Sequence, residues 1–241
     1  MSQFFNQQQP GYNDTLVPQS RDDALEQSRF ITRVFGWMTV GLAVTGFIAL
    51  LVAQRPKLVM EINNLFIVVA LVQFGLIIGL RAAINKISAG VATLLFLLFS
   101  ASMGLTLSII FIVFTRASIE STFFISASTF GAMALYGYFT KRDLTSLGHI
   151  AGMALIGLII AMIVSIFIHS TGLQLAINAI GVLVFVVLTA YDTQKIKYMY
   201  LAGADGTQEN HKAAIVGALQ LYLDFINLFL FLLQFFGKQR D

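Results

Sequence analysis

The sequence predicts an all-α integral membrane protein with seven transmembrane helices. Hydrophobic residues make up 57% of the 241 residues and charged residues only 11%, whereas a soluble domain carries about 25% charged residues. The charges also cluster at short intervals. The stretches between the clusters are long enough to cross a hydrocarbon layer, which takes about 20 apolar residues in a helix. Water is therefore not the main solvent of this chain.

Seven apolar stretches follow one another along the chain. They lie between Arg33 and Arg55, between Glu61 and Arg81, between Lys86 and Arg116, between Glu120 and Lys141, twice within the charge-free segment from Leu144 to Tyr191, and from Ala213 to Phe236. The third stretch is longer than one perpendicular crossing requires, so we expect this helix to be tilted or to include part of its outer loop. The seventh stretch is interrupted by one acid, Asp224.

The domain boundaries follow from the same pattern. Residues 1–28 have no apolar run. We predict that they form a disordered cytoplasmic tail and not a signal peptide, which needs a hydrophobic segment. Residues 29–237 then form the transmembrane domain, and residues 238–241 form a short C-terminal tail. The chain has no cysteine, which excludes a disulfide, an iron–sulfur cluster and a thiolate zinc site.

The orientation follows from the lysines and arginines, because short basic loops stay on the cytoplasmic side. With the N-terminus inside, the inner segments hold Arg21, Arg29, Arg33, Arg81, Lys86, Lys141, Arg142, Lys195, Lys197 and Lys212. The outer segments hold Arg55, Lys57, Arg116, Lys238 and Arg240. This two-to-one excess predicts a cytoplasmic N-terminus and an outer C-terminus. The inner loops also explain the formal charge of +3, and without a basic surface domain we predict no nucleic-acid partner.

Polar groups inside the spans are the candidates for function, because such groups are costly there and usually face the protein interior or a water-filled path. Asp224 lies eleven positions after Ala213, which places it near mid-membrane at a rise of about 1.5 Å per residue. One face of the last span carries Gln220, Asp224, Asn227 and Gln234. One face of the preceding span carries Asn178, Thr189 and Asp192. We therefore expect two adjacent helices to turn polar faces toward each other.

Three ionisable side chains converge on the cytoplasmic half of this bundle. Asp192 stands near the inner end of the sixth span, and Asp224 meets it at a similar depth as the seventh span returns. Arg81 ends the second span, which also ends inside. Two carboxylates and one guanidinium can form a partly buried cluster there. The sequence leaves other roles open: Arg81 as an anchor at the lipid interface, Asp192 as a solvated helix end, and Asp224 as a structural polar contact.

Two segments resemble the paired signature of the Bax inhibitor family of seven-helix membrane proteins. They are residues 190–196, Ala-Tyr-Asp-Thr-Gln-Lys-Ile, and residues 221–229, Leu-Tyr-Leu-Asp-Phe-Ile-Asn-Leu-Phe. The hydropathy profile extends the resemblance over residues 30–237, and the Gln-containing tail resembles the bacterial branch. The resemblance implies a C-terminal helix surrounded by the other six and a location in the bacterial inner membrane. It also implies a pH-sensitive calcium leak controlled by two aspartates, here Asp192 and Asp224.

The resemblance further implies that a basic residue of the second helix acts as a latch on the first aspartate, and Arg81 matches that position. Many members have an acid inside the second helix, where this chain has Gln73, which attracts a cation less strongly. Two carboxylates close together in low dielectric cannot both ionise easily, so the pair should titrate as a unit and sense protons. Which of the two takes the proton stays open.

Calcium is expected as a permeant ion that passes near Asp192 and Asp224, with no cofactor and no resident metal. Carboxylate, Asn, Gln and Thr oxygens suit a hard cation, but a dedicated calcium site needs about six to eight oxygens. The remaining polar groups expected along the path are Gln220, Asn227, Asn178, Thr189 and Gln73.

An enzyme is not predicted, because the three histidines lie at predicted helix ends or loops and not beside a buried serine. The alternative to a leak is an interaction protein. The resemblance to the Bax inhibitor family supports this alternative, because its bacterial members are also associated with binding and restraining a membrane-bound quality-control protease. Removal of residues 1–25 would separate the two functions, since it should abolish protease binding and leave a leak intact.

Overall fold

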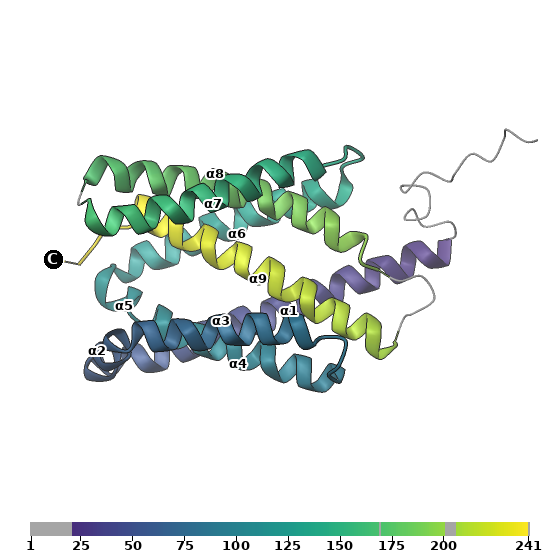
Figure 1. Cartoon of the computed structure of the whole chain (residues 1–241), viewed down its shortest axis with the longest axis horizontal. Coiled ribbons are helices and arrows are strands. Elements are labelled where there is room, and N and C mark those ends of the chain that lie inside the picture. The colour runs from purple at the N-terminus through teal and green to yellow at the C-terminus, as the bar shows by residue number, and fades with distance from the viewer. Residues whose placement is uncertain (1–20, 169, 201–205, 241) are drawn as a thin grey trace, which may run out of the picture.

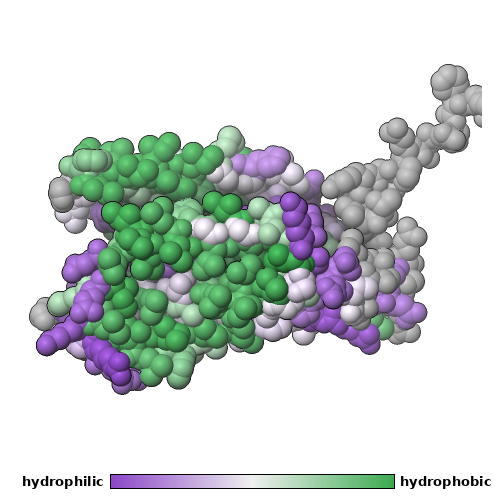
Figure 2. Space-filling model, turned by 60° about the horizontal axis from the view of Figure 1, so that its bottom comes forward, coloured by the Kyte–Doolittle hydropathy of each residue, from purple (hydrophilic) through white to green (hydrophobic). Residues whose placement is uncertain are grey.

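The computed structural model describes residues 21–168, 170–200 and 206–240 as a bundle of helices with one isolated β-bridge, between Phe114 and Gln239. In chain order the helices are α1 (Arg21–Ala53), α2 (Pro56–Asn64), α3 (Phe66–Ala83), α4 (Ala89–Leu107), α5 (Ile110–Val113), α6 (Arg116–Phe139), α7 (Thr145–Phe167), α8 (Thr171–Lys197) and α9 (Gln208–Phe236). The long helices run along the length of the molecule (Figure 1). On the face shown in Figure 2, apolar side chains cover the middle and hydrophilic ones gather at the two ends, as a bilayer requires.

Six helical segments of the described residues are long and apolar enough to cross a membrane. They are α1, α3, α4 continued by α5, α7, α8 and α9. The third predicted span is interrupted, because α4 ends at Leu107 and the short α5 follows, and the two together form one candidate span over Ala89–Val113. The fourth predicted span is α6, which has 24 residues but is not among the six. Its serines, its two threonines and the two charges near its start dilute its apolar residues.

The boundary of the N-terminal tail differs from the prediction. Because α1 begins at Arg21, residues 21–28 are helical and do not belong to a disordered tail. Asp22 and Asp23 stand in the first turn, where acidic side chains stabilise a helix N-terminus. Gln27 is buried and donates its Nε2 to the carbonyl oxygen of Lys197, at the end of α8, over 3.1 Å. Gln27 lies before the first apolar stretch of the sequence, so the hydropathy pattern could not predict this contact. Residues 1–20, the rest of the predicted tail apart from these helical residues, lie outside the described residues.

Helix α9 is the most covered of the candidate spans. In its most apolar window 72% of the residues are buried, against 11% in α3 and in α7. It packs against α1, α4, α6 and α8, whereas α3 packs on α4 and α7 packs on α8. Tyr222 of α9 is fully buried, and its hydroxyl shares a 2.6 Å hydrogen bond with Thr45 of α1. One side of α9 stays visible between α3 and α7 (Figure 1).

Helices α6 and α8 make a backbone contact at Gly137. A Cβ atom at this position would overlap the carbonyl oxygen of Ala190, two residues before Asp192. Small residues allow helix backbones to approach this closely in membrane proteins. The contact therefore fixes the inner part of α8, which carries the candidate site.

We expect Gly137→Ala to lower the free energy of unfolding by about 1–3 kcal/mol, since the added methyl group forces the two backbones apart. The decrease should appear as a lower Tm of the purified protein in nanodiscs. Gly131→Ala is the matched control on the same helix, because a Cβ there would meet no described atom within 4 Å. Equal Tm values for the two variants would contradict the close contact.

Candidate functional site

The polar face of α9 lines a cavity of about 570 Å³ between α3, α7, α8 and α9. The polar side chains in its wall are Arg81, Asp192, Gln220, Asp224, Asn227 and Gln234. The stretch of α9 from Gln220 to Gln234 covers about 21 Å at 1.5 Å per residue. The cavity thus follows α9 lengthwise, with the two aspartates and Arg81 toward the N-terminal end of α9. The spacing of the four polar residues on α9 predicted this common face.

Arg81 and Asp192 are linked through Gln220. Nη2 of Arg81 donates to Oε1 of Gln220, and Nε2 of Gln220 donates to Oδ2 of Asp192 over 2.9 Å. The sequence predicted a direct contact between the guanidinium and the carboxylate. The amide can stand between them because it offers both an acceptor and donors, and because Gln220 lies one turn before Asp224 on the same face of α9. We call this chain of three residues the inner latch.

Asp192 and Asp224 are both buried, with exposed fractions of 4% and 2%, whereas Arg81 is exposed. Both carboxyl groups line the cavity, and they are close enough to act on each other electrostatically. Among the described residues, Oδ2 of Asp224 has no hydrogen-bond partner. Buried carboxyl groups this close exchange protons as a pair. The site therefore holds two coupled acids, only one of which is joined to the inner latch.

Three residues of the predicted polar path do not line this cavity. Gln73 of α3 donates its Nε2 to the hydroxyl of Thr106 in α4 over 2.9 Å. Thr189 is fully buried and donates its hydroxyl to the carbonyl oxygen of Phe185 in its own helix over 2.7 Å. Asn178 is buried. Since α8 packs against α6, α7 and α9, side chains only part of a turn apart on α8 face different neighbours.

Two features of the site were missed in the sequence. Gln220 was expected in the polar path, but its place between Arg81 and Asp192 was not. Its position one helical turn before Asp224, on the same face of α9, could have indicated that place. Gly152 of α7 also lines the cavity, and a Cβ there would meet no described atom within 4 Å. Within the described ranges, no group of three or more His, Asp or Glu side chains could hold a metal.

Comparison with known proteins identifies the family. Residues 27–241 match the family model described as Inhibitor of apoptosis-promoting Bax1. The chain belongs to this Bax inhibitor family. Membership confirms the resemblance carried by residues 190–196 and 221–229.

Bacterial relatives match this member of the Bax inhibitor family over nearly their whole length. Inner membrane protein YbhL of Escherichia coli K12 is 50% identical over 230 residues, which cover 91% of this chain and 98% of the relative. An uncharacterized protein of Borreliella burgdorferi is 43% identical over 228 residues, covering 93% and 98%. YrjE of Lactococcus lactis, also uncharacterized, is 33% identical over 230 residues, covering 93% and 96%. The name of YbhL places that relative in the inner membrane, in agreement with the candidate spans found here.

Proposed function

We propose that this protein is a pH-sensitive cation leak, with calcium as the permeant ion, gated by Asp192 and Asp224. One observation carries the proposal: two buried carboxyl groups line the same long cavity, and one of them is tied to Arg81 through Gln220. The aspartates act as the proton sensor, and the inner latch acts as the gate.

The wall of the cavity supports cation passage. Asn227 and Gln234 supply amide oxygens along α9 beyond the two carboxyl groups. Oxygen atoms of these types are the ligands that a hard cation accepts, although they are fewer than the six to eight or so of a storage site. A path lined by carboxylates selects for cations. Calcium would therefore pass along α9 without being retained.

The inner latch supports control by protons. Ionised Asp192 accepts a charge-assisted hydrogen bond from Gln220, which in turn holds Arg81. Protonation removes that charge, which weakens the hydrogen bond from Gln220 in α9 to Asp192 in α8 and the attraction of Asp192 for Arg81 in α3. Because α3 is attached to the bundle through α4 and is largely exposed, its inner end is free to separate from α9. Acid should therefore raise the leak.

The decisive experiment is calcium flux into liposomes that contain the purified protein and a trapped calcium dye. We expect flux well above that of empty liposomes, increasing as the pH falls. Asp143→Asn, in the loop between α6 and α7, is a control variant that should behave as the parent protein. A chloride dye should report only background flux, since the path is lined by carboxylates. Chloride flux equal to calcium flux would contradict a cation path.

We also propose seven crossings, with α6 as the additional span and α9 surrounded by the other six helices. At 24 residues, α6 is about 36 Å long, which exceeds the hydrocarbon thickness of about 30 Å. It packs against both α8 and α9. In addition, α1 begins at one end of the bundle and α9 ends at the other (Figure 1), which fits an odd number of crossings.

Reporter fusions test this topology. A reporter placed before Met1 should be cytoplasmic, and one placed after Asp241 should be outside, because the basic inner segments stay in the cytoplasm. A third reporter inserted after Asp143 should be cytoplasmic and serves as an internal reference. If both termini lie on the same side, one crossing is lost and the depth assigned to Asp224 is wrong.

The protease-binding alternative depends on residues 1–25, most of which lie outside the described residues. It therefore stays a prediction, tested by the truncation described above.

A further inference from the structure

We propose that the cavity along α9 also binds an amphipathic organic ammonium ion, with its charged nitrogen on Asp224 and its hydrocarbon part against α7. This ligand site requires only the cavity and does not depend on the proposed leak.

One carboxylate oxygen at the polar end of the cavity has no hydrogen-bond donor. Oδ2 of Asp224 is buried and unpartnered among the described residues, although Asp224 lines the cavity. A buried carboxylate oxygen without a donor carries a large desolvation penalty. An ammonium N–H would supply both the missing donor and an opposite charge.

The charged groups around Asp224 are compatible with a bound cation. Asp192 faces it from α8, and Arg81 acts on it from α3. The Arg81 guanidinium donates to Gln220 and not to Asp224, and Lys195 acts on Asp192. The remaining wall, from α7, brings only uncharged apolar residues to the lining. A bound ammonium ion would reduce the repulsion between the two carboxylates, so that both could ionise in its presence. Among the residues that line the cavity, Arg81 carries the other charge.

The rest of the cavity suits a hydrocarbon. Apolar side chains from four helices form most of the wall, among them Ile77, Leu155, Met162, Phe185 and Leu230. The volume of about 570 Å³ lies within the range of about 300–1,000 Å³ that is typical of small-molecule sites. A small inorganic cation uses none of this apolar surface, whereas an alkylammonium ion uses both parts of the cavity. The cavity is not fully enclosed, which gives such a ligand a way in.

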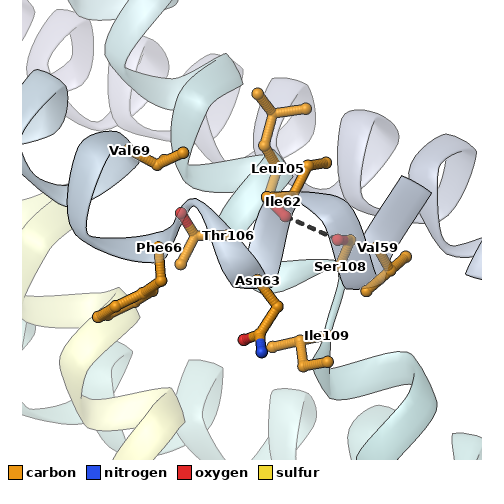
Figure 3. Close-up of a pocket in the computed structure, with 9 residues that line it drawn as sticks. All are labelled: Val59, Ile62, Asn63, Phe66, Val69, Leu105, Thr106, Ser108 and Ile109. Atoms are coloured by element: carbon orange, nitrogen blue, oxygen red, sulfur yellow. Dashed lines mark hydrogen bonds between the residues drawn. The ribbon is translucent and has the colours of Figure 1, made fainter. Parts of the chain in front are cut away.

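The pocket between α2, α3 and α4 shows the contrast (Figure 3). Its volume is only about 70 Å³. Its hydroxyl groups are already engaged, since Ser108 donates to the carbonyl oxygen of Leu105 over 2.6 Å and Thr106 accepts from Gln73. It carries neither the space nor the unpartnered charge that the cavity along α9 has.

The test is binding of n-hexylammonium to the protein in phosphatidylcholine nanodiscs, measured by equilibrium dialysis against empty nanodiscs and by the shift in Tm. Hexylammonium should bind and raise the Tm. Hexanol and hexanoate should not, because they lack the positive charge, and hexyltrimethylammonium should bind more weakly because it has no N–H. Asp224→Asn should weaken hexylammonium binding about tenfold or more, as loss of a charged hydrogen-bond partner does.

Matched variants on α7 distinguish filling of the cavity from general damage. Gly152→Leu places a side chain in the cavity and should abolish binding without lowering the Tm of the free protein. Gly157→Leu lies on an exposed part of the same helix, where a Cβ meets no described atom within 4 Å, and should bind as the parent does. Equal hexylammonium affinity in the parent protein, Asp224→Asn and Gly152→Leu, or equal binding of hexanol, would overturn the proposal.

Addition of phosphatidylethanolamine to the nanodiscs separates two sources of the ammonium group. If the aminolipid headgroup is the natural ligand, the lipid should compete and raise the apparent Kd for hexylammonium. An unchanged Kd assigns the site to free amines. Dialysis detects either result without any flux, so a failed calcium leak would leave this inference standing.

Discussion

Asp192→Asn protein in calcium-dye liposomes is expected to leak about tenfold faster than the parent protein at neutral pH, and to respond little to acid. In the parent, the ionised carboxylate accepts a 2.9 Å hydrogen bond from Gln220 and so holds Arg81. A hydrogen bond to a charged group contributes about 1.5–3 kcal/mol, and about 1.4 kcal/mol corresponds to tenfold. The neutral amide lacks that charge at every pH, so the gate should stay open.

Two further variants complete this prediction. Arg81→Ala should produce the same open, pH-insensitive leak, because it removes the other end of the inner latch. Asp224→Asn should change both the pH midpoint and the rate, because this residue is coupled to Asp192 and lines the path itself. If Asp192→Asn and Arg81→Ala both leak with the pH dependence of the parent, the latch is wrong and Arg81 is only an interfacial anchor.

Gln220→Leu is expected to open the gate to a similar extent, about tenfold at neutral pH, with Asp192 and Arg81 both intact. Leucine has a similar size but can neither accept from Arg81 nor donate to Asp192, so both links of the inner latch are lost at once. The measurement is again calcium flux across pH. Gln208→Leu, an exposed position at the start of the same helix, should leave the flux and its pH dependence unchanged.

This variant separates two forms of the latch. If Gln220→Leu leaks little at neutral pH and more in acid, Arg81 can hold Asp192 directly, as the sequence predicted. An open leak would show that the amide is an obligatory link. The double variant, Asp192→Asn with Gln220→Leu, then tests whether both changes remove the same gate. If they do, it should leak no faster than either single variant at any pH.

The sequence by itself determined the membrane environment, the positions of the apolar helices, the family and the polar face of α9. These properties are local, since they depend on charge spacing and on the 3.6-residue period within one helix. Gln220, Asp224, Asn227 and Gln234 share a face whatever lies opposite them. The same charge spacing predicted a fourth span in α6, whose 24 residues are not among the six candidate spans.

Only the tertiary structure decided what each polar side chain contacts. The insertion of Gln220 between Arg81 and Asp192, the burial of Thr189 away from the cavity, and the helical start at Arg21 all depend on neighbouring helices. The rotation and relative depth of those helices are set by backbone contacts such as that of Gly137 with Ala190. Spacing along one helix fixes which side chains share a face, but the packing of the whole bundle fixes which partner that face meets.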